Sequence, residues 1–353
     1  MLAFPFKSVC IESFALHLPT YEVTSAEIED RLAPLYDRLK VPYGTLEKVS
    51  GVHTRRFWDP QVNPSEVATE AAKRALDHIG FDREHIGAVF NTSVTRDFFE
   101  PATSALVHGN LELPETVIAI DITNACIGFS NGMQLLGNLI ESGVVKAGIV
   151  TSGENIARII ESSFKLVLED ETLQRDDLLR LLPTFTLGCG AAAMVLCHES
   201  IATSGHKLNG CVSRTASQHN MLCKGNGDFH INQRLDLNPI MHTESQGLIG
   251  EAAKLGRRMW DDFSKVFHWE RDDIDHIFCH QVGKQVNKAF YKEMTLDMKK
   301  EFTTYQRFGN LVSSSLPAAF FTGVDEKNIQ SGEKILLTAF GSGLNSNFVG
   351  ITW

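Results

Sequence analysis

Cys126 lies where an apolar segment gives way to a helical pattern. Residues 117–122 are apolar and largely β-branched, which predicts a buried strand. Apolar residues then recur at helical spacing from 127 to 140, and Gly143 is suited to end that helix. A thiol at a strand-to-helix junction faces the positive end of the helix dipole, which favours the thiolate. Cys126 is therefore a candidate nucleophile for covalent catalysis, the alternative being an inert buried cysteine.

Three further positions are suited to acyl chemistry. His280 ends an apolar strand pattern just before a helix, whose N-terminus disfavours imidazolium, so a neutral imidazole is expected to act as acid, base or donor. Asn310 follows a glycine in a loop, where its amide can donate to a carbonyl oxygen without titrating. The segment 341–343 could expose backbone N–H groups as an oxyanion hole. Taken singly, each has an ordinary alternative: a core or surface histidine, a turn asparagine and a hairpin turn.

The composition is that of an ordinary globular protein, and it argues against several classes of function. The 353 residues are 43% hydrophobic and 22% charged, and the net charge of −10 comes without a basic tract, so no nucleic-acid partner is expected. The seven cysteines contain no C-x-x-C spacing, which argues against a disulfide framework and a zinc site, and no metal is expected. We find neither a secretion-signal pattern nor an apolar run of about 20 residues, so a cytoplasmic protein is expected.

Strand and helix patterns alternate along the whole chain. Strands are expected at 8–18, 86–94, 117–122, 147–152, 208–214, 273–280, 334–339 and 347–353. A boundary near 199–203 separates an N-terminal half, 1–202, from a C-terminal half, 203–353, and each half has a functional candidate at a strand end. Residues 155–182 are polar, charged and helical in pattern, so they are expected to form an insertion outside the sheet. The arrangement predicts α/β layers and is compatible with a duplicated unit.

In this order, the motifs resemble those of the thiolase-fold condensing enzymes, and of ketoacyl synthase III in particular. The matching motifs are 124–129 (NACIGF), 280–281 (HQ), 309–310 (GN) followed by 313–315 (SSS), and 339–343 (AFGSG). The segment 188–193 (GCGAAA) also matches, although Cys189 replaces a residue that is usually acidic. The resemblance covers essentially the whole chain. It implies an α/β thiolase fold of two duplicated βαβαβαββ halves in an αβαβα layered arrangement, with the nucleophilic cysteine in the first half and the histidine and asparagine in the second.

A narrower resemblance is to the OleA family, whose members join two acyl-CoA chains head to head. It is carried by 91–101 (NTSVTRDFFEP), 187–194 (LGCGAAAM), 222–226 (LCKGN) and 341–345 (GSGLN). Glu100 distinguishes the two families, because ketoacyl synthase III enzymes typically have a bulky apolar residue at this position. A decarboxylating condensation makes its carbanion by losing CO₂, whereas joining two ordinary acyl thioesters requires a base that removes an α-proton. Burial in an apolar pocket would suit a carboxylate to that role, the alternative being a solvated loop glutamate.

The resemblance also implies a mechanism, a non-decarboxylative Claisen condensation. Cys126 takes the acyl group of a first long-chain acyl-CoA as a thioester and releases CoA. Glu100 of the neighbouring chain in a homodimer then removes an α-proton from a second acyl-CoA. His280 and Asn310 donate hydrogen bonds to the enolate, which attacks the acyl-Cys126 thioester. The product is a 2-alkyl-3-oxoacyl thioester or, after hydrolysis, the acid.

Binding roles follow from the same resemblance. The expected oxyanion-hole and substrate-binding residues are Gly343, Ser342 and Phe129. CoA phosphates require cations, for which the candidates are Arg257, Arg258 and Lys224, with Arg55 and Arg56 as weaker ones. No cofactor is expected beyond the CoA thioester substrates. Downstream enzymes of lipid biosynthesis, olefin biosynthesis in this family, are the further partners that the resemblance suggests.

Two other classes of function remain open. One is a decarboxylating ketoacyl synthase III with a malonyl donor on acyl carrier protein, or an acyltransferase with a small-molecule acceptor, for which Glu100 would be dispensable. The acidic net charge argues mildly against the carrier-protein partner, which is itself acidic. The other is a non-catalytic thiolase-fold subunit, against which the intact Cys126, His280 and Asn310 argue. A cysteine hydrolase is weaker still, because the motifs stand in thiolase-like order.

Overall fold

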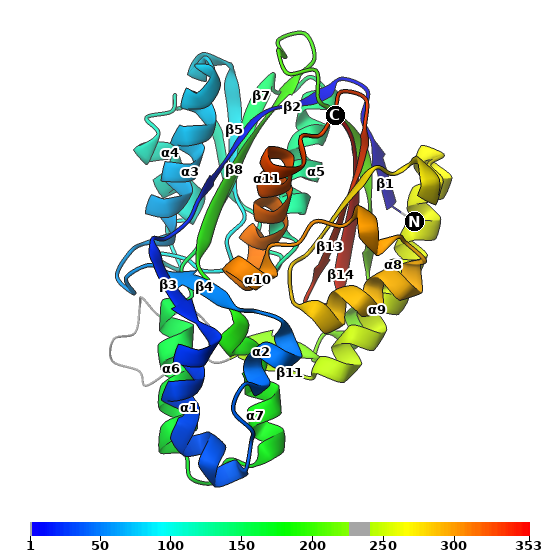
Figure 1. Ribbon diagram of the computed structural model, residues 1–353. Helices are drawn as coiled ribbons and strands as arrows, with labels where there is room; N and C mark the ends of the chain where they lie inside the picture. Colours follow the sequence, from blue (N-terminus) through cyan, green and yellow to red (C-terminus); the bar gives the residue numbers. More distant parts are fainter. Residues whose placement is uncertain (1, 226–240) are drawn as a thin grey trace.

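The computed structural model describes residues 2–225 and 241–353 (Figure 1). Its main sheet has the strand order β12-β13-β14-β9-β2-β8-β7-β5-β6, with β1 paired to β9. The strands are β1 (Leu2–Pro5), β2 (Val9–His17), β3 (Tyr21–Thr24), β4 (Thr54–Phe57), β5 (Ile86–Asn91), β6 (Ile118–Asp121), β7 (Ala147–Glu154), β8 (Gly190–His198), β9 (Lys207–Thr215), β10 (Cys223–Gly225), β11 (Met241–Thr243), β12 (His276–Cys279), β13 (Lys334–Gly341) and β14 (Asn345–Thr352). The α-helices are α1 (Ser25–Leu39), α2 (Thr45–Ser50), α3 (Pro64–Ile79), α4 (Thr103–Asn110), α5 (Gly128–Glu141), α6 (Ala157–Glu169), α7 (Arg175–Leu181), α8 (Ser245–Phe267), α9 (Lys284–Met294), α10 (Tyr305–Phe308) and α11 (Ser315–Lys327). Within the described residues, no helix combines the length and the apolar character that crossing a bilayer requires.

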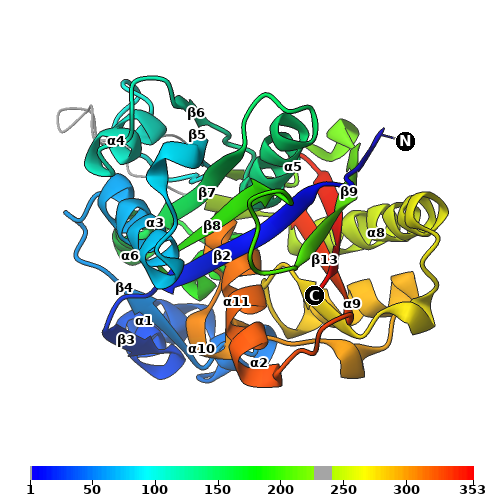
Figure 2. The ribbon, with the colours of Figure 1, turned by 90° about the horizontal axis from the view of Figure 1, so that it is seen from above.

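The main sheet has two parts that meet at the pairing of Cys10 with Lys207, where β2 contacts β9. Strands β2, β8, β7, β5 and β6 form one part, and β9, β14, β13, β12 and β1 form the other. Helices α5 and α11 lie between the two parts and share one apolar cluster with strands of both (Figure 2). Helices α3 and α4 cover the outer face of the first part, and α8 and α9 cover that of the second. The result is the five-layered αβαβα arrangement that the resemblance implies.

The two halves of the chain build these parts from a similar order of elements. Apart from β1, the small sheet of β3 and β4 and the helices α1, α2, α6 and α7, the first half reads β2-α3-β5-α4-β6-α5-β7-β8, the predicted βαβαβαββ unit. The second half, apart from the small sheet of β10 and β11, reads β9-α8-β12-α9-α10-α11-β13-β14. Where a third strand would stand, the described residues have an isolated bridge between Ile277 and Glu301. The duplication is therefore visible in the order of elements, with one strand of the second copy reduced to that bridge.

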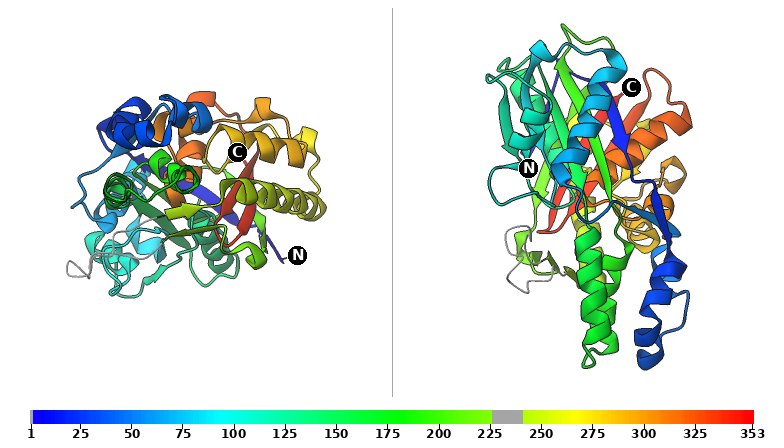
Figure 3. Two further views of the ribbon diagram at one scale, coloured as in Figure 1. Left: turned by 90° about the horizontal axis from the view of Figure 1, so that it is seen from below. Right: turned by 90° about the vertical axis from the view of Figure 1, so that its left-hand side faces the viewer.

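The segment predicted as an insertion, 155–182, contains α6 and α7, which lie outside the main sheet as expected. With α1 and α2 they form a helical lobe, the lower part of the molecule in Figure 1 and in the right-hand view of Figure 3. The lobe has an apolar cluster of its own, in which the rings of Phe164 and Phe185 lie 4.8 Å apart between centroids. Arg31 and Glu161 join α1 to α6 through two contacts of 2.8 Å.

The sequence predicts a buried strand before Cys126, but in the structure this strand lies at an edge of the sheet. Among the described residues, β6 pairs only with β5, and the side chains of Ile118 and Ile120 are 39% and 47% exposed. A strand that is apolar on both faces is typical of a position covered on both sides. An exposed apolar edge strand is a template for pairing with another chain. Residues 2–225 and 241–353 of the single chain thus do not provide the burial of this strand that the sequence implies.

Candidate active site

Cys126 lies on a sharp turn between β6 and α5. The preceding residue, Ala125, has a φ of +46°, a left-handed conformation that is uncommon for a residue other than glycine. Gly128 begins α5, and a Cβ atom there would lie 2.6 Å from the carbonyl oxygen of Thr92, so only glycine fits this approach. Strained backbone of this kind is held by its surroundings and is frequent at functional sites. The turn presents the thiol two residues before the helix begins.

The thiol of Cys126 is stabilised in its protonated form. Burial raises its pKa above the usual value, and the nearby Cys223 thiol and Glu154 carboxyl add to this effect. The thiolate that the helix dipole was expected to favour is therefore not the resting form. The thiol must lose its proton as it attacks an electrophile, and the proton must leave with another group.

His280 follows β12 directly, and its backbone N–H donates to the carbonyl oxygen of Thr338 at 2.9 Å. The residue is 2% exposed, and burial lowers the pKa of the imidazole to about 4. The ring is therefore neutral at physiological pH, as the sequence predicts, and burial is the cause that the structure shows. Its Nδ1 atom has no hydrogen-bond partner among the described residues. A neutral imidazole keeps one N–H donor, which a ligand in the site can use.

Gln281, which the sequence analysis named without a role, fixes the segment that carries His280. Its side-chain amide donates to the carbonyl oxygen of Cys279 at 2.6 Å. Its side-chain oxygen accepts from the backbone N–H groups of Thr304 at 2.9 Å and Tyr305 at 3.2 Å. The buried glutamine thus ties the end of β12 to the segment that leads into the Asn310 turn.

Asn310 is held so that its amide NH₂ group is the end left for a ligand. Its side-chain oxygen accepts hydrogen bonds from the backbone N–H of Val312 and from the Ser315 hydroxyl, both at 2.9 Å. Val312 has a φ of +55°, which is strained for a β-branched residue, and its bond to Asn310 stabilises that turn. The backbone of Asn310 is bonded to Thr186 at 3.0 Å and to Gly188 at 2.9 Å. The donor predicted from the sequence is therefore rigidly oriented.

The glycine segment at the end of β13 packs against the Cys126 turn. A Cβ atom on Gly341 would lie 3.4 Å from the backbone nitrogen of Cys126. Asn345 donates to the side-chain oxygen of Asn124 at 3.0 Å and to the carbonyl oxygen of Ser342, also at 3.0 Å. The contact joins the first and second halves of the chain at the nucleophile. It brings Gly341, the first residue of the predicted oxyanion-hole segment, against the backbone of Cys126.

Phe129 lies in the central layer. It is 2% exposed and packs edge-to-face on Phe321 of α11, with the ring centroids 6.2 Å apart. In the structure this predicted substrate-binding residue therefore packs α5 against α11.

Glu154, at the end of β7, is a buried part of the site that the sequence analysis missed. Its carboxylate is fully buried and accepts hydrogen bonds from backbone and hydroxyl groups of Thr95 and Ser313, residues 59 and 159 positions away in sequence. Burial raises the pKa of this carboxyl group, while these hydrogen bonds act against the rise. The one available signal was an acidic residue two positions after the predicted strand 147–152.

Glu100 lies on a loop whose base is firmly held. Arg96 donates to the Thr123 hydroxyl at 2.8 Å, and the buried Asp97 accepts from the backbone N–H of Ser65 at 2.9 Å. The next three residues are exposed in the single chain, namely Phe98, Phe99 and Glu100. The predicted base therefore faces solvent on this chain, next to two aromatic side chains that a partner could cover.

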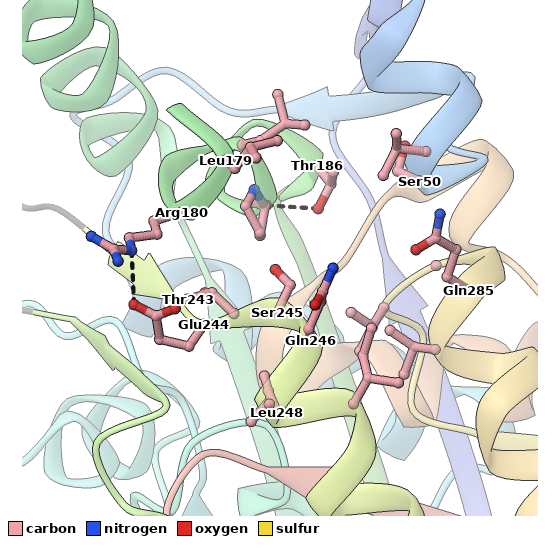
Figure 4. Close-up of a pocket in the computed structure, with 18 of the residues that line it drawn as sticks. Ser50, Leu179, Arg180, Thr186, Thr243, Glu244, Ser245, Gln246, Leu248 and Gln285 are labelled. Atoms are coloured by element: carbon pink, nitrogen blue, oxygen red, sulfur yellow. Dashed lines mark hydrogen bonds and ion pairs between the residues drawn. The ribbon is translucent and has the colours of Figure 1, made fainter. Parts of the chain in front are cut away.

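A pocket of about 480 Å³ lies between the helical lobe and the start of helices α8 and α9 (Figure 4). Its wall is mainly apolar and includes Leu179 of α7 and Leu248 of α8. Thr186, Val282 and Gly283 line it as well. The carbonyl oxygen of Thr186 accepts a hydrogen bond from the backbone N–H of Asn310, and Val282 lies two residues beyond His280. The pocket therefore adjoins the segments that carry the two candidate donors, His280 and Asn310.

The predicted CoA-binding cations do not line this pocket. Arg257 and Arg258 are exposed farther along α8, and Lys224 is exposed on β10. Arg55 is fully buried and donates to the carbonyl oxygens of Val23 and Phe185 and to the Ser25 hydroxyl, so its guanidinium is used within the lobe. Arg56 donates to the carbonyl oxygen of Pro19. The arginine that does line the pocket is Arg180, which lies 2.8 Å from Glu244 (Figure 4). Across residues 2–225 and 241–353, no three His, Cys, Asp or Glu side chains are grouped to hold a metal ion.

Comparison with known proteins places this site in a family. Residues 120–215 and 267–353 match the N-terminal and C-terminal family profiles of 3-oxoacyl-[acyl-carrier-protein] synthase III. The acyl-CoA:acyl-CoA alkyltransferases of Xanthomonas campestris and Shewanella oneidensis are 32% and 33% identical, each over 99% of both chains. A β-ketoacyl-[acyl-carrier-protein] synthase III of Neisseria meningitidis is 26% identical over 83% of this chain and 85% of its own.

Solved structures give the same result. The cerulenin-bound OleA of Xanthomonas campestris superimposes with a TM-score of 0.93 at 32% identity, covering 99% of this chain and 98% of its own. Structures of that enzyme also include variants of one cysteine, one glutamate and one histidine, and a complex with lauric acid and lauroyl-CoA. With this identity over nearly the full length, the chain is a thiolase-fold condensing enzyme, an acyltransferase that belongs to the OleA family of acyl-CoA:acyl-CoA alkyltransferases.

Proposed function

We propose that this enzyme joins two long-chain acyl-CoA molecules head to head, without a malonyl donor. The observation that carries the proposal is the hydrogen bonding of Glu154, a buried carboxylate that acts electrostatically on Cys126. Glu154 acts electrostatically on Cys126, but its lone pairs already accept hydrogen bonds from Thr95 and Ser313, so it is poorly suited to take an α-proton. The base that this condensation requires must then come from elsewhere, and Glu100 is the candidate.

The first step forms the acyl-enzyme. The Cys126 sulfur bonds to the thioester carbon of the first acyl-CoA, the bond from that carbon to the CoA sulfur breaks, and the thiol proton leaves with CoA. Backbone N–H groups at Cys126 and Gly343 stabilise the oxyanion. Because the thiol is protonated at rest, this step accelerates as the pH rises.

The second step forms the carbon–carbon bond. The partner subunit's Glu100 removes an α-proton from the second acyl-CoA. The neutral His280 and the oriented amide of Asn310 donate to the enolate oxygen, because charge develops there. The enolate carbon attacks the acyl-Cys126 thioester, the carbon–sulfur bond to Cys126 breaks, and the sulfur regains a proton as the partner subunit's Glu100 returns the α-proton that it removed. The product is a 2-alkyl-3-oxoacyl-CoA.

Two observations support donation of Glu100 by a neighbouring copy, and a third relates Glu100 to a glutamate that has been replaced in a relative. The carboxylate is exposed on the single chain, between Phe99 and the proline that follows. The apolar edge of β6, with Ile118 and Ile120 exposed, lies on the strand that leads to Cys126. In the OleA variants of Xanthomonas campestris, the replaced glutamate and cysteine are separated by the same interval as Glu100 and Cys126. A homodimer follows from this assignment.

The pocket of Figure 4 is the proposed entry for the pantetheine arm of acyl-CoA. Its lining is largely apolar with amide and hydroxyl groups, among them Gln246 and Gln285, which suits a chain of methylene and amide groups. It adjoins the segments that carry His280 and Asn310, so a thioester at its inner end would reach both donors. The complex with lauroyl-CoA known for the Xanthomonas campestris enzyme agrees with a ligand of this class.

The test uses myristoyl-CoA as the only substrate, with CoA release and lipid products followed by mass spectrometry. The wild type should give a coupled carbon–carbon product or the ketone that forms from it by decarboxylation. The E100A variant should be acylated at Cys126 and release at most one CoA per subunit, because it lacks the base. C126A should not be acylated at all.

The matched control is E171A, which removes an exposed glutamate of the helical lobe and should condense at the wild-type rate. Normal condensation by E100A would remove Glu100 from the mechanism. Release of only free fatty acid by the wild type, with no coupled product, would overturn the proposed reaction. Malonyl donors, as used by β-ketoacyl synthases III, would then be the next substrates to test.

A further inference from the structure

Glu154 joins two catalytic segments that are remote in sequence. Its carboxylate is fully buried at the end of β7. On one side it accepts from the backbone N–H of Val94 at 2.8 Å, and from the N–H and hydroxyl of Thr95 at 3.0 and 2.9 Å. On the other side it accepts from the N–H and hydroxyl of Ser313. Each side therefore holds its segment through more than one donor.

Both segments lead directly to residues of the proposed reaction. Thr95 begins the loop that ends at Glu100, and Ser313 belongs to the turn in which Ser315 fixes the side-chain oxygen of Asn310. A second residue of β7 also holds this turn. The Ser152 hydroxyl forms hydrogen bonds with the Ser313 hydroxyl at 2.6 Å and with the Ser314 hydroxyl at 2.7 Å. Bonds to a buried charged group are among the stronger ones in proteins. The end of β7 is thus a shared anchor for the two segments.

The same carboxylate acts electrostatically on the proposed nucleophile. Burial is the main cause of the raised pKa of the Cys126 thiol and of the buried Cys189 thiol, and the Glu154 carboxylate adds to both effects. The hydrogen bonds that Glu154 accepts from Val94, Thr95 and Ser313 come from neutral backbone and hydroxyl groups. A substitution of Glu154 should therefore change the pKa of the Cys126 thiol as well as the positions of the two segments.

We propose that Glu154 is a positioning residue, which holds the base loop and the Asn310 turn in one fixed arrangement relative to Cys126. The inference rests on the proposed condensation, because only that reaction needs both segments in place at once. Acylation of Cys126 requires neither the base nor the enolate donors. Loss of the anchor should therefore affect the two half-reactions unequally.

The test compares E154Q with the wild type in both half-reactions. A glutamine keeps the shape of the side chain but replaces one acceptor oxygen by an NH₂ group, which cannot accept from Thr95 or Ser313. Condensation should fall between about 10-fold and 100-fold, as expected for lost hydrogen bonds to a charged group, while acylation by myristoyl-CoA changes about threefold or less. E154D, which restores the charge, should recover part of the condensation rate.

A second readout separates positioning from general damage to the fold. The rate of Cys126 alkylation by iodoacetamide rises with pH as the thiolate forms, and E154Q should shift this profile to lower pH because a neighbouring negative charge is removed. The matched control is E12Q. Glu12 is another buried glutamate that anchors a loop, through the backbone N–H groups of Thr203 and Ser204, but its partners are not part of the site. E12Q should leave both the alkylation profile and the ratio of the half-reactions unchanged.

A double-mutant cycle tests whether the two segments are coupled through the carboxylate. T95V and S313A should lower condensation non-additively in the wild-type background and additively in E154Q. Wild-type condensation by E154Q, or equal losses in both half-reactions with an unchanged alkylation profile, would overturn the inference. Failure of the wild type itself to condense acyl-CoA would instead count against the proposed function, so the two failures are distinguishable.

Discussion

At the scale of single residues, burial favours the neutral forms of both the proposed nucleophile, Cys126, and the proposed enolate donor, His280. It raises the pKa of the Cys126 thiol and lowers that of His280 to about 4. A neutral imidazole can donate to an enolate without competing for its proton. The lowered pKa of His280 also makes the stability of the fold depend on pH, because the unfolded chain binds a proton at this residue more readily than the folded chain does.

We expect H280Q to remove this pH dependence. Between the unfolded pKa of about 6.5 and the folded value of about 4, the unfolded state holds more protons, so the wild type loses stability as the pH falls. The unfolding free energy of the wild type should drop by about 2 kcal/mol more than that of H280Q between pH 7.5 and pH 5. Urea unfolding at the two pH values measures the difference, and H78Q, at an exposed histidine of α3, is the control. An equal drop in H280Q and the wild type would show that the imidazole is solvated.

The sequence indicates the candidate reacting side chains but not their environment. Cys126, His280 and Asn310 stand in motifs whose local context is readable, and the structure gives each a fixed place. The prediction that Cys126 favours the thiolate was wrong. A junction between strand and helix is visible in a sequence, whereas the burial of the thiol at that junction is not. Glu154 was missed for a related reason, since Ser313 lies 159 positions away and no local pattern records the contact.

At the scale of elements, most strands and helices follow from apolar periodicity, and two exceptions have physical causes. β6 has the sequence of a strand covered on both faces, but one face is exposed in the single chain. The third strand of the second half is reduced to the bridge at Glu301, where no regular pattern was expected. The segment that carries α6 and α7 was predicted as an insertion, but its packing with α1 and α2 and its contribution to the pocket depend on contacts between helices that are distant in sequence.

The link between α7 and the start of α8 gives a second prediction. Arg180 lines the pocket and pairs with Glu244, so a CoA phosphate at the pocket mouth would compete for the same guanidinium. R180A should raise KM for myristoyl-CoA by up to about tenfold while leaving KM for myristoyl-pantetheine nearly unchanged, because the latter has no phosphate. E244Q should act in the opposite direction. Steady-state kinetics with the two thioesters would decide.

R257A is the matched control for this experiment, since Arg257 is an exposed arginine of α8 outside the pocket lining. It should leave both KM values unchanged. An equal rise in KM for both thioesters in R180A would mean that Arg180 supports the shape of the pocket and does not bind a phosphate.

At the scale of the whole molecule, the assignment of Glu100 to the neighbouring chain can be tested by mixing variants. A heterodimer of C126A and E100A, isolated through two different affinity tags, contains one site with an intact cysteine and an intact glutamate from the partner subunit. It should recover about half of the wild-type condensation rate, although each parent homodimer is inactive in condensation. A heterodimer as inactive as its parents would indicate that Glu100 serves its own chain.

The exposed edge of β6 and the exposed Glu100 loop bear on how this enzyme responds to dilution. If a second chain completes the site, condensation per milligram of enzyme must fall once the protein concentration drops below the dissociation constant of the pair, while acylation of Cys126 by a single chain is far less sensitive. Loss of pairing would then turn a carbon–carbon bond-forming enzyme into one that only stores an acyl group. The amount of enzyme present, and not only the amount of substrate, would set which of these two outcomes occurs.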